Sequence, residues 1–466
     1  MKRNTLRKLV FLFFLIASVA AQAQEFTVDG VIYCIDNSEE VWINGYTEDI
    51  PQHLIIPEIV NNGDASYHVT AINAGSFENC KELVSITIPN NIIELEGYTF
   101  EDCINLSSVT LPDKLIKIHG GAFMNCKNLT SITIPSSVTE IGTEAFWGTG
   151  LTSINIPNNV SSIIPGAFSG CRKLETIMVE SGNKVYDSRN NCNAIIETES
   201  NKLITGCQNT IIPNGVTCIE QYAFCDCSNL NRIIIPSSVN NIMFAAFFNC
   251  YGLTSIQVES GNKVYDSRNN CNAIIETKTS SLILGCPTTI IPNSVKNIGT
   301  YAFANYSDIT SISIPNSVKL IYYSAFSGCR SLQSIVLPQN LGLIANSAFT
   351  GCSGIKDVYC YAEDAPQTNI TFYNHAFSES SYTEARLHVP ASSIEKYRNA
   401  SVWNEFKEIV ALTDNDPTPT GVKHIHSDNM INKRYYSLDG KNYTKPQRGL
   451  NIIHQSNGTN KKLIMK

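Results

Sequence analysis

The sequence contains few of the patterns on which catalysis and metal binding depend. It has no Gly-rich phosphate loop, no Gly-x-Ser-x-Gly nucleophile motif and no His-Glu-x-x-His zinc motif. Its eight histidines are scattered, and only His424 and His426 lie close together, in a stretch that we interpret as a solvated tail. No Cys-x-x-Cys motif has metal-ligand spacing. We therefore expect no catalytic residues, no cofactor and no bound metal.

Long hydrophobic runs are missing except at the N-terminus. Leu9 to Ala20 is apolar, and Ala21-Gln22-Ala23 has the small-x-small form of a cleavage site. The basic start consists of Lys2, Arg3, Arg7 and Lys8. A membrane anchor is the alternative, but the apolar run is short and polar residues follow it. Residues 1–23 are thus predicted to be a signal peptide, and no other stretch approaches a transmembrane segment.

An excess of basic residues is also missing. Removing the signal peptide takes away four basic residues and no acidic ones, so the formal net charge falls from −7 to −11. This balance argues against a nucleic-acid partner, because phosphate binding needs a basic face. The charge is ordinary for a soluble exported protein.

A repeated stretch is what the sequence does contain. Gly121 to Val138 reads GAFMNCKNLTSITIPSSV, and versions of it recur along most of the chain. Its phenylalanine marks each repeat at Phe77, Phe100, Phe123, Phe146, Phe168, Phe224, Phe247, Phe303, Phe326 and Phe349. Successive spacings are 22 or 23 residues, except for two of 56, which equal 23 plus an insertion of 33. A fixed period in this range is the signature of a stacked repeat.

Each repeat has the pattern Phe-x-x-Cys-x-x-Leu-x-x-Ile-x-Ile-Pro. Around Phe123 its members are Phe123, Cys126, Leu129, Ile132, Ile134 and Pro135. The alternating end predicts a strand with one buried face, which stops at the proline because proline has no N–H for a ladder. One unit cannot bury its apolar face alone. Stacked units would place Phe on Phe, Cys on Cys and Ile on Ile in continuous ladders, which predicts a β-rich solenoid.

These units resemble the leucine-rich repeats of the Treponema pallidum type, found in BspA-like bacterial surface proteins. The resemblance runs from about Ile72 to Val410 and covers the period, the core residues and the following Val-x-x-Ile-Gly. The repeat at Phe146 departs from it by lacking Cys, and the repeat at Phe303 has Tyr306 in the Cys slot. The resemblance implies an extracellular binding protein, with adhesion known for some members. It does not imply a catalytic centre.

The sixteen cysteines allow two interpretations. Eight of them occupy the same slot of the repeat: Cys80, Cys103, Cys126, Cys171, Cys227, Cys250, Cys329 and Cys352. Stacked neighbours could come within disulfide range, since adjacent strands lie near the required Cα separation. We favour buried free thiols, because a free cysteine packs as a small hydrophobic residue.

The chain divides by composition into five parts. We predict a signal peptide (1–23), an N-terminal cap (24–66), the solenoid with its closing cap (67–412), a polar linker (413–421) and a C-terminal tail (422–466). Two insertions, Glu180 to Gly206 and Glu259 to Gly285, share the segment ESGNKVYDSRNNCNAIIET, and each is expected to form a hairpin. Recent duplication explains their identity, and a paired ligand-binding element is the alternative. The tail resembles sorting tails of exported Bacteroidetes proteins. It is either a sorting signal that attaches the protein to the outer surface or a small β module.

The candidate binding residues are the outward side chains of the predicted strands. They are Ser85, Thr87, Ser108, Thr110, Ser131, Thr133, Ser153, Asn155, Arg232 and Gln257. A structural explanation suffices for each one, because Thr and Ser suit an exposed strand position. Together they would form a broad concave sheet, uncharged apart from Arg232, for an extracellular protein or glycan. We therefore predict a secreted or cell-surface adhesion protein. A passive surface-layer scaffold is the alternative, and a hydrolase with its site in the insertions is the least favoured interpretation.

Overall fold

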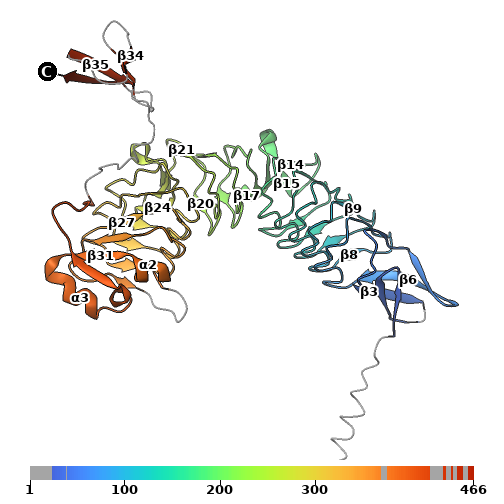
Figure 1. Ribbon diagram of the computed structural model, residues 1–466. Coiled ribbons are helices and arrows are strands. Elements are labelled where there is room, and N and C mark those ends of the chain that lie inside the picture. The colour runs from blue at the N-terminus through green and yellow to red at the C-terminus, as the bar shows by residue number, and fades with distance from the viewer. Residues whose placement is uncertain are drawn as a thin grey trace, which may run out of the picture. The chain divides into compact units, whose positions relative to one another are not determined.

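The computed structural model describes residues 24–37, 39–368 and 375–419, and the backbone of four strands between residues 434 and 465. The predicted signal peptide and the pair His424 and His426 lie outside these residues. The chain divides into two compact units, Met1–Thr420 and Gly421–Lys466. Successive turns of the first unit follow one another along the chain in Figure 1, so the predicted β-rich solenoid is confirmed.

Most turns of the solenoid contribute two short strands, although residues 131–134 form no strand in their turn. The Ile-x-Ile segment supplies the first, and these strands pair in parallel with their counterparts in neighbouring turns. The first strand set comprises β4 (His53–Ile55), β7 (Ser85–Thr87) and β9 (Ser108–Thr110); β12 (Ser153–Ile156) and β14 (Thr176–Val179); β19 (Arg232–Ile235) and β21 (Ser255–Val258); and β27 (Ser334–Leu337), β29 (Asp357–Cys360), β31 (Arg386–Val389) and β32 (Glu408–Ala411).

The segment before Gly in Val-x-x-Ile-Gly supplies the second strand of a turn. Together with the strands of the two insertions they form three sheets, and an insertion begins the second and the third of these. The second strand set comprises β8 (Glu94–Leu95), β10 (Lys117–Ile118), β11 (Glu140–Ile141) and β13 (Ser162–Ile163); β15 (Tyr186–Asp187), β16 (Ala194–Glu197), β17 (Lys202–Gly206), β18 (Cys218–Ile219) and β20 (Asn241–Ile242); and β22 (Tyr265–Asp266), β23 (Ile274–Glu276), β24 (Ser281–Leu284), β25 (Asn297–Ile298), β26 (Leu320–Ile321), β28 (Leu343–Ile344) and β30 (Gln367–Thr368).

The predicted cysteine slot is buried and its thiols are free. All sixteen cysteines are unpaired, and all but Cys227 are buried. The thiol of Cys103 donates to the carbonyl oxygen of Phe77 in the preceding turn at 3.0 Å, and Cys126 bonds Phe100 in the same way at 3.1 Å. The prediction of buried free thiols is therefore confirmed. At six stacking steps the thiol also satisfies a backbone acceptor of the preceding turn, which packing alone would not do.

The two departures from the cysteine pattern form other hydrogen bonds, because neither hydroxyl donates to the phenylalanine carbonyl of the preceding turn. Thr149 stands in the slot after Phe146, and its hydroxyl donates to the Phe146 carbonyl at 3.0 Å. Tyr306 is longer than cysteine, and its hydroxyl donates to the carbonyl of Cys250 across the second insertion at 3.1 Å.

The phenylalanine ladder is not continuous, which corrects the expectation from the sequence. Rings stack at 5.2–5.4 Å from Phe77 to Phe168, at 5.1 Å between Phe224 and Phe247, and at 5.0–5.2 Å from Phe303 to Phe377. The two breaks coincide with the insertions. The reason is that strands β17 and β24 enter the stack there. Gly206 ends β17 and Gly285 follows β24, and each glycine takes the position that Phe holds in other turns.

Each insertion forms the predicted hairpin. Strands β16 and β17 pair antiparallel, and β17 then pairs in parallel with β18 of the next turn. The shared segment fastens the hairpin to the preceding turn. The amide nitrogen of Asn183 donates to the carbonyls of Pro157 and Val160, both at 2.9 Å, and the Tyr186 hydroxyl accepts the N–H of Ile163 at 2.9 Å. Asn262 and Tyr265 make the same contacts in the second insertion, with Pro236, Val239 and Ile242.

The N-terminal region begins with a hairpin, in which β1 (Glu25–Val28) pairs antiparallel with β2 (Val31–Ile35). Asp29 and Gly30 both have positive φ, at 48° and 74°, as a tight hairpin turn requires. The five-stranded sheet consists of β1 (Glu25–Val28), β2 (Val31–Ile35), β3 (Glu40–Tyr46), β6 (Ala65–Ile72) and β5 (Ile59–Asn62). Its buried residues share one core with the following turns. That this sheet acts as a cap stays a prediction.

The last turns bury an aromatic cluster. Phe377 extends the ladder, and Trp403 and Phe406 meet its ring edge-on at 5.9 and 5.5 Å. Tyr397 and Trp403 donate to the carbonyls of Ala362 and Pro366 at 2.9 and 2.8 Å. The helical segments here are α2 (Glu379–Glu384), η3 (Ala391–Ser393), α3 (Ile394–Asn399) and η4 (Trp403–Glu405). Their role as a closing cap likewise stays a prediction.

The second unit contains a four-stranded antiparallel sheet, as the β-module interpretation of the tail expects. Its order is β34 (Asn442–Tyr443), β33 (Arg434–Tyr436), β35 (Gly449–His454) and β36 (Asn460–Met465). That this unit is a sorting signal stays a prediction.

Candidate binding surface

The ten predicted binding residues, here called the strand ribbon, lie on or between strands of the first set. Ser85 and Thr87 belong to β7, Ser108 and Thr110 to β9, Ser153 and Asn155 to β12, Arg232 to β19 and Gln257 to β21. Ser131 and Thr133 lie between β9 and β12 in a segment outside the regular strands. All ten side chains are exposed or half-buried, whereas the alternate positions Ile86, Ile154 and Ile233 are buried. The predicted alternation therefore holds at these positions, and it is weaker at Val109 and Ile132, which are half-buried.

The ribbon is in register where its strands pair. Ser85 lies opposite Ser108, and Thr87 lies opposite Thr110. Side chains at such positions are direct neighbours across parallel strands, so four hydroxyl groups form one uncharged patch. The structure brings these four residues together as the sequence predicted.

The other members are not part of this patch. Asn155 donates its amide to Glu180 at 2.9 Å, which also accepts the N–H of Asn158. Arg232 and Gln257 belong to a separate sheet and are not opposite each other, since Arg232 pairs with Ser255 and Gln257 with Ile234. The first strand set thus breaks between β9 and β12, where residues 131–134 form no strand, and again at the two insertions.

The ribbon begins one strand earlier than the sequence predicted. Strand β4 pairs in parallel with β7, and the ring Nδ1 of His53 lies 2.8 Å from the Ser85 hydroxyl oxygen. The signal was present, because Leu54, Ile56 and Pro57 repeat the Ile-x-Ile-Pro pattern. The repeat sheet therefore extends into the region predicted as the N-terminal cap.

Exposed apolar side chains on or beside the ribbon were also missed. These residues are Ile55, Met178, Ile211 and Ile290, with exposed fractions of 73, 55, 76 and 63%. Ile211 and Ile290 hold the same position after the two insertions. The surface is therefore a mixture of hydroxyl groups and exposed apolar side chains.

At the C-terminal end the first strand set carries charge. The Nε2 of His388 lies 2.9 Å from a carboxylate oxygen of Asp357, and Arg386 Nε lies 3.2 Å from the same oxygen. The His388 ring stacks on Tyr359 at 4.4 Å. These contacts link β29 to β31, so we attribute a structural role to the cluster.

One cluster in the second strand set has metal-ligand residue types. Glu94, Glu96 and His119 place one ligand atom each within 4.8 Å of one another. The sequence held a signal, because His119 follows Glu96 by one repeat period of 23 residues. The His119 Nε2 lies 2.9 Å from a Glu94 carboxylate oxygen, and this pair explains the arrangement without an ion.

The polar residues of the insertions are engaged with one another. Asp187 accepts hydrogen bonds from the Arg189 backbone, the Arg189 guanidinium and the Thr198 hydroxyl. Burial works to raise the pKa of Asp187, but these hydrogen bonds outweigh it and lower that pKa. Asp266 and Arg268 repeat the network in the second insertion. The shared segment thus has a structural role, which accounts for much of the sequence identity between the two insertions.

Two parallel strands per turn around ladders of Phe, Cys, Leu and Ile define a leucine-rich repeat solenoid. The sequence profile of the BspA type leucine rich repeat region matches residues 60–188, 195–285 and 275–402 in six copies. The chain belongs to this BspA type leucine-rich repeat family. No curated protein matches it. No helix within the described residues is both long and apolar enough to cross a membrane.

Solved structures of three bacterial proteins are similar to this chain. A leucine rich cell surface protein from Faecalibacterium prausnitzii is 24% identical, with 75% of this chain and 96% of that one covered and a TM-score of 0.43. A leucine-rich repeat protein from Bacteroides ovatus is 26% identical, with 74 and 100% covered and a TM-score of 0.35. The leucine rich repeat protein of T. pallidum is 22% identical, with 49 and 91% covered and a TM-score of 0.34.

Proposed function

We propose that this protein is exported and binds a protein or glycan at a cell surface through its strand ribbon. The in-register patch of Ser85, Thr87, Ser108 and Thr110 is the observation that carries the proposal. Such a patch offers donors and acceptors without a charge to desolvate, and the neighbouring Ile55 adds apolar area. Interfaces of this kind combine an apolar centre with a polar surround.

The test is a binding screen of the chain from Gln24 onward against matrix proteins, glycans and whole cells. Arginine substitutions at Ser108 and Thr110 should abolish a saturable interaction, because they place two bulky charges in the patch. Matched arginine substitutions at Ser136 and Ser161, which are exposed but outside the ribbon, should leave it intact. Equal loss in both variants, or retention in both, would reject the ribbon as the binding surface.

The second candidate is a passive surface scaffold attached through the C-terminal unit. Its separation from residues 1–420 as a compact unit favours an independent role for the tail. Deleting residues 421–466 should then release the protein from the cell surface into the medium, as measured by fractionation. Unchanged surface location would reject the attachment role and leave the binding proposal untouched.

A further inference from the structure

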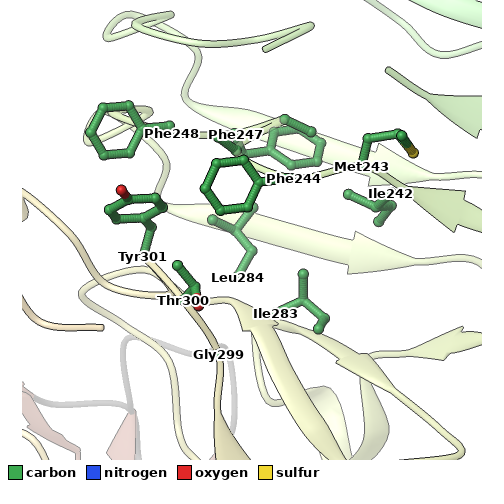
Figure 2. Close-up of a pocket in the computed structure, with 12 residues that line it drawn as sticks. Ile242, Met243, Phe244, Phe247, Phe248, Ile283, Leu284, Gly299, Thr300 and Tyr301 are labelled. Atoms are coloured by element: carbon green, nitrogen blue, oxygen red, sulfur yellow. The ribbon is translucent and has the colours of Figure 1, made fainter. Parts of the chain in front are cut away.

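An apolar pocket of about 180 Å³ opens where the second insertion meets the turn before it, as Figure 2 shows. Strand β20 ends its sheet here, and the next sheet contributes β24 and the turn after β25. The pocket belongs to the second strand set, so it is separate from the strand ribbon. The side chains used below are Met243, Phe244, Phe248, Leu284, Thr300 and Tyr301.

Three aromatic rings gather at this pocket. The ring centroid of Tyr301 lies 5.8 Å from that of Phe244 and 4.5 Å from that of Phe248. Phe244 is 54% exposed and Met243 is 37% exposed. The ladder residue Phe247 is only 7% exposed, so the neighbouring rings are additional to the core. An exposed aromatic cluster beside a hollow is a typical feature of an interaction site.

The first insertion shows that the fold does not require these side chains. The two insertions share the same strands and the same fastening contacts, 79 residues apart. The positions of Phe244, Phe248 and Leu284 correspond at the first junction to Pro165, Ser169 and Thr205. A junction of this type is thus built without the aromatic cluster. Phe244 and Phe248 are therefore not needed to build such a junction, whereas the position of Tyr301 is a tyrosine, Tyr222, there too.

We propose that this aromatic pocket receives one apolar side chain, of phenylalanine or leucine type, from a protein partner. The volume fits, because a cavity of about 150 Å³ lined by apolar residues accommodates a benzene molecule. An uncharged apolar side chain also matches the pocket electrostatically, because every side chain that lines the pocket is uncharged. Buried apolar anchors of this kind dominate the affinity of protein interfaces.

A glycan is a poorer occupant of this pocket. Among the lining side chains, Thr300 and Tyr301 supply the hydroxyl groups. A sugar ring placed there would lose hydrogen bonds from most of its hydroxyls to water without replacement, and each loss is unfavourable. The chemistry of the pocket thus selects a hydrophobic side chain.

The experiment uses the chain from Gln24 to Lys466 with N-acetyl-phenylalaninamide as probe, followed by saturation-transfer NMR. A probe of this size should bind with a dissociation constant of roughly 1 mM. Phe244→Ser should weaken it about tenfold or more, and this variant should fold because the side chain is exposed. Ile164→Ala, at the corresponding region of the first junction, is the matched control and should bind as the parent does.

Peptides and sugars separate the possible occupants. N-acetyl-lysinamide and methyl glucoside should show no saturable binding. Peptides selected from a random library should carry a Phe, Leu or Met, and they should lose their binding to the Phe244→Ser variant. The proposal is overturned if the phenylalanine probe does not saturate by about 20 mM, if Phe244→Ser binds it unchanged, or if methyl glucoside binds as well. Ribbon substitutions should not alter this binding, so the two proposals can fail separately.

Discussion

Gly206 occupies the position in the stack that phenylalanine holds in other turns, and its backbone lies against the ring of Phe224. The N–H of Gly206 donates to the Ala223 carbonyl at 2.8 Å, as the N–H of Phe123 does to Ala145. A Cβ added at Gly206 would lie 2.2 Å from Cε1 of Phe224. The insertion can therefore enter the solenoid only with a residue that has no side chain at this point.

Gly206→Ala should destabilise the first unit by about 3 kcal/mol, at the upper end of the usual overpacking cost. Gly285→Ala should do the same, because its Cβ would lie 2.2 Å from Cε1 of Phe303. The measurement is the free energy of unfolding from denaturant titration. Gly45→Ala is the control, since its Cβ would meet Ile32 at an ordinary 3.6 Å. Equal stability of Gly206→Ala and Gly45→Ala would contradict the packing described.

Phe123→Ala should lower the free energy of unfolding by roughly 3–5 kcal/mol, because it removes a fully buried ring from the ladder. Phe123 stacks on a ring on both sides, whereas the ring stacking of Phe168 is with Phe146 alone. Phe168→Ala should therefore cost about 1 kcal/mol less, the contribution of one aromatic pair. A larger loss at Phe168 than at Phe123 would show that ring stacking is not what distinguishes the two sites.

Tyr186→Phe should cost about 1–3 kcal/mol, because the N–H of the buried residue Ile163 loses its acceptor. Tyr265→Phe removes the equivalent bond to Ile242, which is half-buried, so water can replace the hydroxyl and the loss should be smaller. Thermal melting of both variants tests this order. Tyr98→Phe, at a residue that is 47% exposed, should change the melting temperature little.

The free thiols give a chemical prediction. At pH 8 the folded protein should react slowly with a thiol reagent, because burial raises the pKa of Cys171 to about 12 and of Cys360 to about 11. In denaturant without reductant, all sixteen cysteines should react. If the number of reactive thiols in denaturant falls short of sixteen by an even number, the missing thiols are in disulfides and the buried-thiol interpretation is rejected.

Two other buried thiols, those of Cys192 and Cys271, predict a loss of stability at alkaline pH. Burial raises the pKa of Cys192 and Cys271 to about 11, against roughly 8.5 in the unfolded chain. Below pH ~8.5 the thiols are protonated in both the folded and the unfolded state, so their contribution to stability is complete. Above that pH the thiols of the unfolded chain ionise first, which favours unfolding. The melting temperature should therefore fall as pH rises from about 9 to 11. Replacing both cysteines by alanine should make that fall less steep, and an unchanged slope would contradict the assignment.

The sequence predicted the ribbon's alternation but not its continuity. A period of two in Ser-x-Thr sets which side chains face outward, because successive Cβ atoms of a strand point to opposite faces. Whether two turns are neighbours depends on what lies between them in space. Asn155, Arg232 and Gln257 therefore follow the predicted alternation, yet they lie outside the patch formed by Ser85, Thr87, Ser108 and Thr110.

The repeat, the buried cysteine slot and the hairpin form of the insertions follow from the amino-acid sequence, because each is a local pattern repeated in register. The places where the ladder breaks depend on tertiary contacts, since Gly206 and Phe224 are brought together by the entry of β17 into the stack. The aromatic pocket depends on tertiary contacts as well. Phe244 and Tyr301 are far apart in the chain, and they meet because the insertion between them folds back as a hairpin and lets the two turns approach each other.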